Sequence, residues 1–169
     1  MATKTSKSQG ANPGHVASLH VHPEQSGAPL LTLDALELVA GKGIREDIRY
    51  FNRKSRSTGQ PTRRQVTLIE REQIQEHADF FGIPAISPGV VRSNIETTGI
   101  GLQALLGWEV HVGEAVLFFY EPRTPCFQME RIHPGLQDQM KNGRHGVLAQ
   151  VIRSGMIRVG DPIQKLRQV

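Results

Sequence analysis

The sequence lacks several features that mark large classes of proteins. It contains a single cysteine, Cys126, so no disulfide can form within the chain, and a lone thiol is more typical of a reducing compartment than of a secreted protein. No hydrophobic run approaches the ~20 residues of a membrane-spanning helix. Residues 1–14 contain two lysines but no hydrophobic stretch of the kind found in secretory signals. We therefore expect a cytoplasmic protein without membrane partners.

The short motifs of three common enzyme classes are also missing. The chain has no Walker A sequence, no dinucleotide-binding fingerprint after a predicted strand, and no Gly-x-Ser-x-Gly nucleophile elbow. Aromatic residues make up only 5% of the chain, so stacking platforms for single-stranded nucleic acid are scarce. These absences disfavour nucleotide hydrolysis, nicotinamide chemistry, serine hydrolysis and nucleic-acid binding.

Positive charge is concentrated in one segment, residues 41–64. This segment holds eight basic and two acidic residues and carries +6, whereas the whole chain carries +4, so the rest of the chain is slightly acidic at −2. Arginine predominates over lysine in the chain, 14 to 6. Because the guanidinium group can hold a phosphate or carboxylate through two bonds, this composition suits a discrete small-molecule anion. Two alternatives are a solvated loop and nucleic-acid binding through this segment.

Length and patterning predict one small domain. With 169 residues, 38% hydrophobic and 21% charged, the chain can bury a core. We expect a disordered tail over residues 1–14 and a single domain over 15–169. About seven short strands are predicted, with a hairpin turn at 153–155 and two or three short helices, of which the clearest spans 70–81. The fold class is therefore mainly β (α+β), a small closed β-barrel with a few short peripheral helices. The ranges expected to be strands are 16–22, 30–39, 64–69, 90–97, 109–112, 114–120, 147–152 and 156–159.

Cys126 is the first candidate for chemistry. It follows Thr124-Pro125 directly after residues 114–120, the most hydrophobic predicted strand. Loops at strand ends are common places for reactive groups. A thiolate there could bind a soft metal or act as a nucleophile if nearby arginines lower its pKa. The alternative is a small buried hydrophobic residue.

Arg92 and Asn94 are the second candidate. They lie two residues apart in a predicted strand, so both side chains should point to one face. A guanidinium beside a carboxamide would form a polar clamp for a phosphate or a heterocycle. The alternative is the exposed face of an amphipathic strand.

A histidine pair is a weaker candidate. His20 and His22 share one face of the first predicted strand and could supply two metal ligands, with a third from Cys126 or His133. No compact spacing connects these residues, so a zinc site is not the favoured interpretation.

Several elements, taken in order, resemble the MOSC domain family, which is named for the C-terminal domain of molybdenum-cofactor sulfurases. The resemblance covers residues 16–164 and depends on the order and spacing of its elements. These elements are Arg64-Gln65-Val66-Thr67-Leu68-Ile69, Pro88-Gly89, Arg92-x-Asn94-Ile95, Gly99, Leu105 and Gly107, Val112-Gly113-Glu114-Ala115, Pro125-Cys126, Arg144-His145-Gly146, Gly155-Met156-Ile157 and Gly160-Asp161.

The resemblance implies a closed β-barrel and a molybdenum-pterin cofactor. Cys126 matches the cysteine that ligates molybdenum in related reductases. The positions that would hold the cofactor are Arg92 and Asn94, with Arg49, Arg64 and Thr124 as further contacts. The implied function is reduction of N-hydroxylated compounds or transfer of the cofactor's sulfur, with a possible redox partner protein. The related reductases have a Ser-Arg pair directly before this cysteine. This chain has Thr124-Pro125 there, so one phosphate donor is missing.

Two other functions can be compared with this one. The first is a non-enzymatic module that binds a phosphorylated small molecule in an arginine-rich pocket. The second, pyridoxal phosphate chemistry, is disfavoured because Lys42, Lys54 and Lys141 have no recognisable Schiff-base context.

Overall fold

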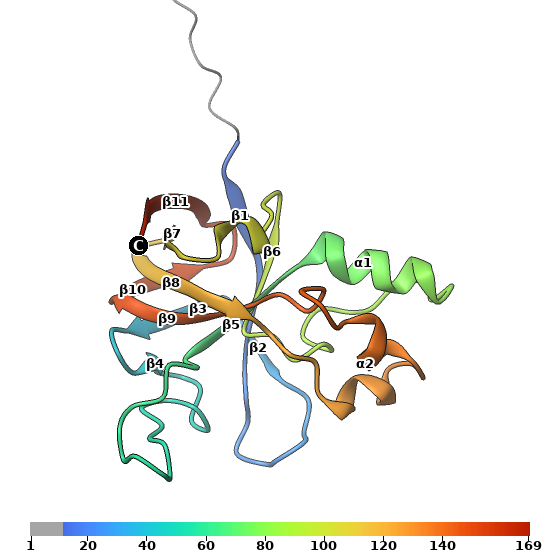
Figure 1. Ribbon diagram of the computed structural model, residues 1–169, viewed down its shortest axis with the longest axis horizontal. Coiled ribbons are helices and arrows are strands. Elements are labelled where there is room, and N and C mark those ends of the chain that lie inside the picture. Colours follow the sequence, from blue (N-terminus) through green and yellow to red (C-terminus); the bar gives the residue numbers. More distant parts are fainter. Residues whose placement is uncertain (1–11) are drawn as a thin grey trace, which may run out of the picture.

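The computed structural model describes residues 12–169, which form strands, two short α-helices and two 3-10 helices (Figure 1). Residues 1–11 of the expected tail lie outside the described range, and Gly14, the last residue of that tail, already begins the first strand. The strands are β1 (Gly14–Val21), β2 (Leu31–Leu33), β3 (Ala35–Val39), β4 (Gly43–Ile44), β5 (Val66–Glu70), β6 (Ile95–Thr98), β7 (Trp108–Val112), β8 (Ala115–Pro122), β9 (Val147–Arg153), β10 (Gly155–Arg158) and β11 (Pro162–Gln168). The helices are α1 (Arg71–Phe80), η1 (Gln103–Leu105), η2 (Phe127–Arg131) and α2 (Leu136–Gln139).

Seven strands form a closed barrel in the order β11-β7-β8-β9-β5-β6-β1. Antiparallel pairing of β1 with β11, through Gly14 with Ile163 and His15 with Pro162, closes it. Strands β5 and β6 run parallel, and α1 forms the crossover between them, as parallel neighbours require. A second sheet, β10-β3-β4, packs beside β8 and β9. The predicted small closed β-barrel with short peripheral helices is confirmed.

Two hydrophobic clusters hold the molecule together. The larger fills the barrel with inward-facing side chains such as Leu19, Leu68 and Leu117, all fully buried. The smaller lies between α1, η2 and α2 and includes Ile74 and Ala78. Burial of each such large side chain contributes about 1.5–3 kcal/mol, so the clusters fix both the barrel and the helices on its side.

Helix α1 forms where its spacing predicts it. Ile74 and Ala78, four residues apart, face the smaller cluster, and Gly82 follows with a φ of 66°, a left-handed conformation typical of a helix end. At ten residues, α1 is the longest helix of the described chain. No helix within residues 12–169 is long and hydrophobic enough to cross a membrane.

The predicted strand over residues 90–97 is mostly a turn. Only Ile95–Thr98 forms a strand, because Gly89 and Arg92 adopt positive φ values of 83° and 61°, which interrupt an extended chain. The Arg92 N–H donates to the Gly89 carbonyl at 3.0 Å and closes this turn. Arg92 and Asn94 therefore do not share a strand face.

The predicted hairpin around residues 153–155 is also wrong. Strand β10 pairs with β3, whereas β9 pairs with β8 and β5. At the bend, an ideal Cβ on Gly155 would lie only 2.5 Å from the backbone of Glu114, so this close approach requires glycine. The turn at residues 159–160 leads into β11, which the pattern did not predict because almost all of its side chains are exposed.

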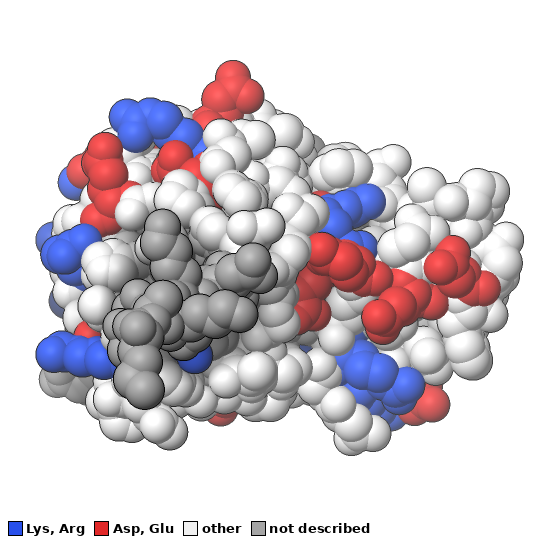
Figure 2. All heavy atoms as spheres, turned by 90° about the horizontal axis from the view of Figure 1, so that it is seen from above, with Lys and Arg blue, Asp and Glu red and all other residues white. Residues whose placement is uncertain are grey.

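The acidic side chains near α1 and the basic segment lie in different parts of the molecule. Acidic side chains gather over α1 (Figure 2), where Glu70, Glu72 and Glu76 line a shallow cavity. The basic segment 41–64 lies instead among the loops at the lower end of the barrel in Figure 1, beside the β1–β2 loop.

Candidate functional site

Four loops meet at one end of the barrel, and contacts of their side chains join them. They are the β1–β2 loop, the basic segment, the turn before β6 and the loop after β8. Arg92 Nη1 donates to the Ala28 carbonyl at 2.9 Å, and Arg123 Nη2 donates to the Arg92 carbonyl at 2.9 Å. The basic segment is attached through Asp47, whose carboxylate lies 2.8 Å from Nδ1 of His22.

Arg123, directly after β8, is the most unusual charge in this site. Its side chain is buried and donates to the Val91 and Arg92 carbonyls, while its Nε has no partner in the described chain. None of the ion pairs within residues 12–169 involves it. Burial, with repulsion from the nearby Arg64 charge, lowers the pKa of Arg123 to about 9. A buried cation without an acid is stabilised by a bound anion.

Cys126 is exposed, so it is not the small buried hydrophobic residue that was its alternative interpretation. It precedes η2 in an extended conformation, and its carbonyl accepts a hydrogen bond from the Met129 N–H at 3.1 Å. A thiolate at Cys126 lies close enough to raise the pKa of Arg123, so the two charges attract each other. The loop thus presents a thiol to solvent beside a buried cation.

Arg92 lies at the centre of the site. Its left-handed backbone is a strained conformation for a residue other than glycine and costs on the order of 1–3 kcal/mol. Hydrogen bonds to Ala28 and from Arg123 hold it there. Its side chain lines two cavities, one on each side of the turn.

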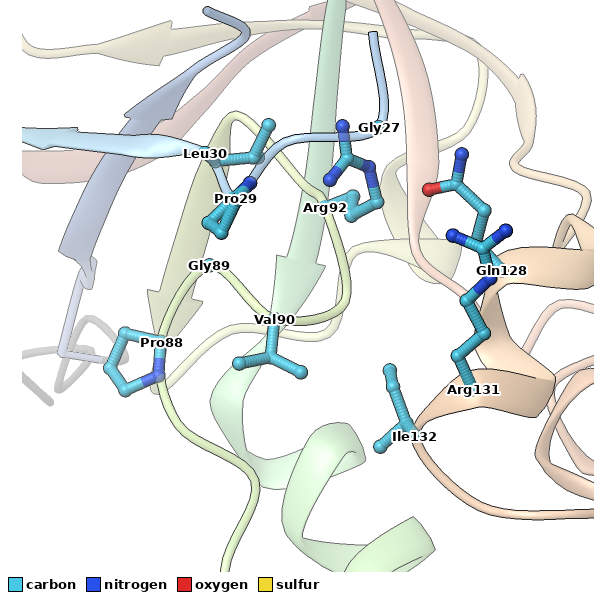
Figure 3. Close-up of a pocket in the computed structure, with 10 residues that line it drawn as sticks. All are labelled: Gly27, Pro29, Leu30, Pro88, Gly89, Val90, Arg92, Gln128, Arg131 and Ile132. Atoms are coloured by element: carbon cyan, nitrogen blue, oxygen red, sulfur yellow. The ribbon is translucent and has the colours of Figure 1, made fainter. Parts of the chain in front are cut away.

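The larger cavity has a volume of about 340 Å³, within the range of small-molecule pockets. Figure 3 shows Pro29, Pro88 and Val90 on one side and Gln128, Arg131 and Ile132 on the other, with Arg92 between them. No acidic residue lines it, and neither arginine forms an ion pair within residues 12–169. Gln128, Arg131 and Ile132 come from or directly follow η2, the helix that Cys126 precedes. Such a cavity suits a flat, partly hydrophobic ligand that carries negative charge.

Asn94 lies in the smaller cleft, but its amide is already occupied. Its Nδ2 donates to the His20 carbonyl and to Asp47 Oδ2, both at 3.1 Å, while its Oδ1 accepts from the N–H and hydroxyl of Thr67, also at 3.1 Å. An amide has two donors and two acceptor lone pairs, so this set leaves none for a ligand. Asn94 connects β1, β5 and the basic segment, and it positions the site instead of clamping a ligand.

The other predicted contacts are divided among different places. Arg64 lines the smaller cleft with His22, Tyr50 and Arg92. Thr124 is exposed and lines a different cavity of about 650 Å³, which it shares with Arg123. Arg49 is exposed and lines neither of the cavities beside Arg92.

The histidines do not assemble a metal site. His20 Nδ1 lies 3.1 Å from the Ser93 carbonyl, and burial lowers the pKa of His20. The ring of His22 is held by Asp47, and Nδ1 of His133 lies 2.7 Å from the Pro134 carbonyl. Among residues 12–169, no three His, Cys, Asp or Glu side chains are grouped to hold a metal ion.

Sequence reasoning missed two buried residues of this region. Arg123 had one usable signal, a charged residue directly after the most hydrophobic strand. His145 stood only within the Arg144-His145-Gly146 element of the resemblance and was given no role; its ring is fully buried, and neither nitrogen has a partner in the described chain. Burial and the charge of Arg123 lower the pKa of His145 to about 2, so its ring stays neutral under ordinary conditions.

Comparison with known proteins defines the family. The sequence model of the MOSC domain matches residues 39–164. The chain belongs to the MOSC domain family. This family is linked to molybdenum-cofactor binding. No curated protein matches this MOSC chain by sequence comparison.

Solved structures share the MOSC fold. The YUAD protein from Bacillus subtilis is 23% identical with a TM-score of 0.72, over 89% of this chain and 93% of that one. YiiM from Escherichia coli is 22% identical with a TM-score of 0.65, over 94% and 70%. YiiM from Geobacillus stearothermophilus is 17% identical with a TM-score of 0.66, over 92% and 76%. At these sequence identities the similarity shows a shared fold and nothing further.

Proposed function

We propose that this MOSC protein holds a molybdenum-pterin cofactor at the Cys126 end of the barrel and reduces N-hydroxylated compounds with it. The observation that carries the proposal is the pairing of Arg123, a buried cation without an acid, with the exposed thiol of Cys126. Membership of a family linked to this cofactor supplies its chemical identity.

The residues present fit such a group. Molybdenum accepts a soft thiolate ligand, which Cys126 can supply. The cavity of about 340 Å³ offers hydrophobic walls for a flat heterocycle. Arg92 and Arg131 offer guanidinium groups for a phosphate, and the absence of lining carboxylates leaves their charge available. Arg123 supplies the cation that the Thr124-Pro125 sequence removes from the positions next to the cysteine.

Each residue has a defined task in this proposal. The bound cofactor would supply the two-electron chemistry that converts an N–O–H group and two protons into N–H and water, with electrons from a redox partner protein. Arg123 places a positive charge three residues before Cys126 in the same loop. Asn94 and Asp47 hold the surrounding loops in place. The ring of His145 is neutral, so it adds no second positive charge beside Arg123.

A turnover assay tests the proposal. Protein purified without oxygen from cells that make the cofactor should reduce an N-hydroxylated amidine when given a strong reductant, and Cys126→Ser should reduce this rate to background. Because Cys126 is exposed, the variant should fold normally. Equal rates in both proteins would contradict the proposal. A persulfide on Cys126 without turnover would indicate sulfur transfer instead.

A non-enzymatic function is the second candidate, because the cations of the site do not depend on the thiol. Arg92 and Arg131, which line the cavity of about 340 Å³, could bind a phosphorylated small molecule without a metal, while Arg123 holds the Arg92 turn from behind. In that case, Cys126→Ser would leave ligand affinity unchanged and Arg92→Gln would remove it, with no turnover in either protein.

A further inference from the structure

We propose that residues 52–64 form a second anion site, which binds a diphosphate group independently of the Cys126 site. Apart from Arg64, which also lines the smaller cleft beside Arg92, this part of the basic segment takes no part in the function proposed above. It is called the basic hairpin here, because its two arms run alongside each other.

The basic hairpin is folded, not a loose solvated loop. An isolated antiparallel bridge joins Lys54 to Pro61, and the Thr62 N–H donates to the Arg53 carbonyl at 2.9 Å. The Ser55 N–H donates to the Gln60 carbonyl at 2.8 Å across the same arms. At its base, the Asn52 N–H donates to the Lys42 carbonyl at 2.8 Å. These bonds fix the directions in which the basic side chains leave the backbone.

Four cations of this region surround one cavity of about 250 Å³, and no acidic residue lines it. None of the ion pairs within residues 12–169 involves these four side chains. Arg45, elsewhere in the basic segment, is paired with Glu37. Cations gathered without acids repel one another, so an anion in the cavity relieves that repulsion. The cavity is lined by Tyr50, Arg53, Lys54, Ser55, Arg56, Thr62 and Arg64.

The number and type of donors favour a diphosphate over a single phosphate. Three guanidinium forks can each bind two phosphate oxygens, and Lys54 adds a point charge. Ser55 and Thr62 add hydroxyl donors at the cavity wall. Arg53 lies over the Tyr50 ring, 5.2 Å from its centre, which limits the freedom of that guanidinium.

The shape favours a small molecule over nucleic acid. The cations face one cavity instead of forming a stripe along which a phosphate backbone could run. Tyr50 is already in contact with Arg53 and with the His22 ring at 4.7 Å, so it offers no free face for a base. The cavity shares Tyr50 and Arg64 with the smaller cleft beside Arg92, but it shares no residue with the larger cavity there. Inorganic pyrophosphate and the diphosphate of a nucleotide carry the same recognised group.

Calorimetric titrations of the purified protein test this site with pyrophosphate, ADP and inorganic phosphate. We expect pyrophosphate to bind at least about tenfold more tightly than phosphate, and the double variant Arg53→Gln/Arg56→Gln to weaken pyrophosphate binding at least about tenfold. ADP binding as tight as that of pyrophosphate assigns the diphosphate alone as the recognised group, and tighter ADP binding assigns a nucleotide. The matched control Arg158→Gln removes an exposed arginine paired with Glu114 and should change nothing. Cys126→Ser should also bind pyrophosphate normally, which separates this site from the proposed cofactor site.

Three results would overturn the proposal. The first is unchanged pyrophosphate affinity in the double variant. The second is loss of pyrophosphate binding in Arg92→Gln with the hairpin intact, which would place the anion at the Cys126 site. The third is tighter binding of a single-stranded oligonucleotide than of either diphosphate, with affinity that falls steeply with salt, which would indicate nucleic acid.

Discussion

Two groups of arginine lie at the same end of the barrel, and their surroundings differ. In the basic hairpin, Arg53 and Arg56 are exposed, so water and salt screen their charges. Arg123 is only 6% exposed, and burial lowers its pKa to about 9. A charge in a low-dielectric environment acts more strongly on its neighbours than one in water. For the Cys126 site, the burial of one cation therefore matters more than the number of cations in the neighbouring segment.

The two groups also differ in how firmly they are held. Asn94, through His20 and Thr67, connects the turn that holds Arg92 to strands β1 and β5 of the barrel. The hairpin is held mainly by backbone bonds within its own arms. Substitutions of the residues that hold the Arg92 and Arg123 loops should therefore destabilise the whole fold, whereas substitutions in the basic hairpin should act locally.

The largest effect is expected for Asn94→Ala. The substitution removes the side-chain partners of the Thr67 N–H and the His20 carbonyl and one of the donors to Asp47 Oδ2, and we expect the free energy of unfolding to fall by about 3 kcal/mol. Urea unfolding measures this change. The control Gln60→Ala, in the exposed hairpin, should change stability by less than about 0.5 kcal/mol. Similar losses in both variants would remove the distinction between the two groups.

The next largest effect is expected for Arg123→Met on anion binding. Phenyl phosphate combines a hydrophobic ring with an anion, as the cavity beside Arg92 requires. Arg123 does not line this cavity, but it donates to the Val91 and Arg92 carbonyls that hold the turn beside it. Its loss should therefore weaken the binding of phenyl phosphate about thirtyfold, or about 2 kcal/mol. Arg56→Gln should change this affinity less than about twofold. A larger effect of Arg56→Gln than of Arg123→Met, measured by calorimetry, would reverse the comparison.

A pH effect follows from His145. Its pKa is lowered to about 2, so below pH 6.5 the unfolded chain binds a proton that the folded chain does not. This residue should lower the free energy of unfolding by about 1.4 kcal/mol for each pH unit below 6.5. Between pH 6.5 and pH 5, the free energy of unfolding of His145→Leu should therefore fall less steeply than that of wild type, by about this amount for each pH unit. Identical slopes from urea unfolding at each pH would show that His145 is not buried as a neutral ring.

The smallest effect is expected for Arg49→Gln. The sequence resemblance placed Arg49 among the cofactor contacts, but the residue is exposed and lines neither cavity beside Arg92. We expect stability to change by less than about 0.5 kcal/mol and the affinity for phenyl phosphate to stay within about twofold. A larger loss of affinity would show that the basic segment moves onto the ligand.

The barrel could be predicted because its signals are local. Alternation and turn residues gave most of its strands, and the spacing of Ile74 and Ala78 gave α1. The pairing of β10 with β3 could not be predicted, because the partner of a short exposed strand is decided by packing far away in the sequence. The conformation of Arg92 was missed for a related reason. Its positive φ is stabilised by bonds to Ala28 and from Arg123, and neither residue is a sequence neighbour.

The candidate site was predicted in part. The sequence pointed to Cys126 and Arg92, and the structure places both among the loops that meet at one end of the barrel, while their roles stay predictions. The role expected of Asn94 was different, since saturation of its amide is visible only in three dimensions. Arg123 was missed because composition counts charges but does not report which one is buried.

Molybdenum content per chain tests the central claim most directly. Wild-type protein, Cys126→Ser, Arg123→Met and Arg56→Gln should be purified together without oxygen from cells that make the cofactor, and their metal measured by mass spectrometry. We expect molybdenum in wild type and in Arg56→Gln, almost none in Cys126→Ser and a reduced amount in Arg123→Met. Molybdenum that is absent from wild type, or equal in wild type and Cys126→Ser, would contradict the account.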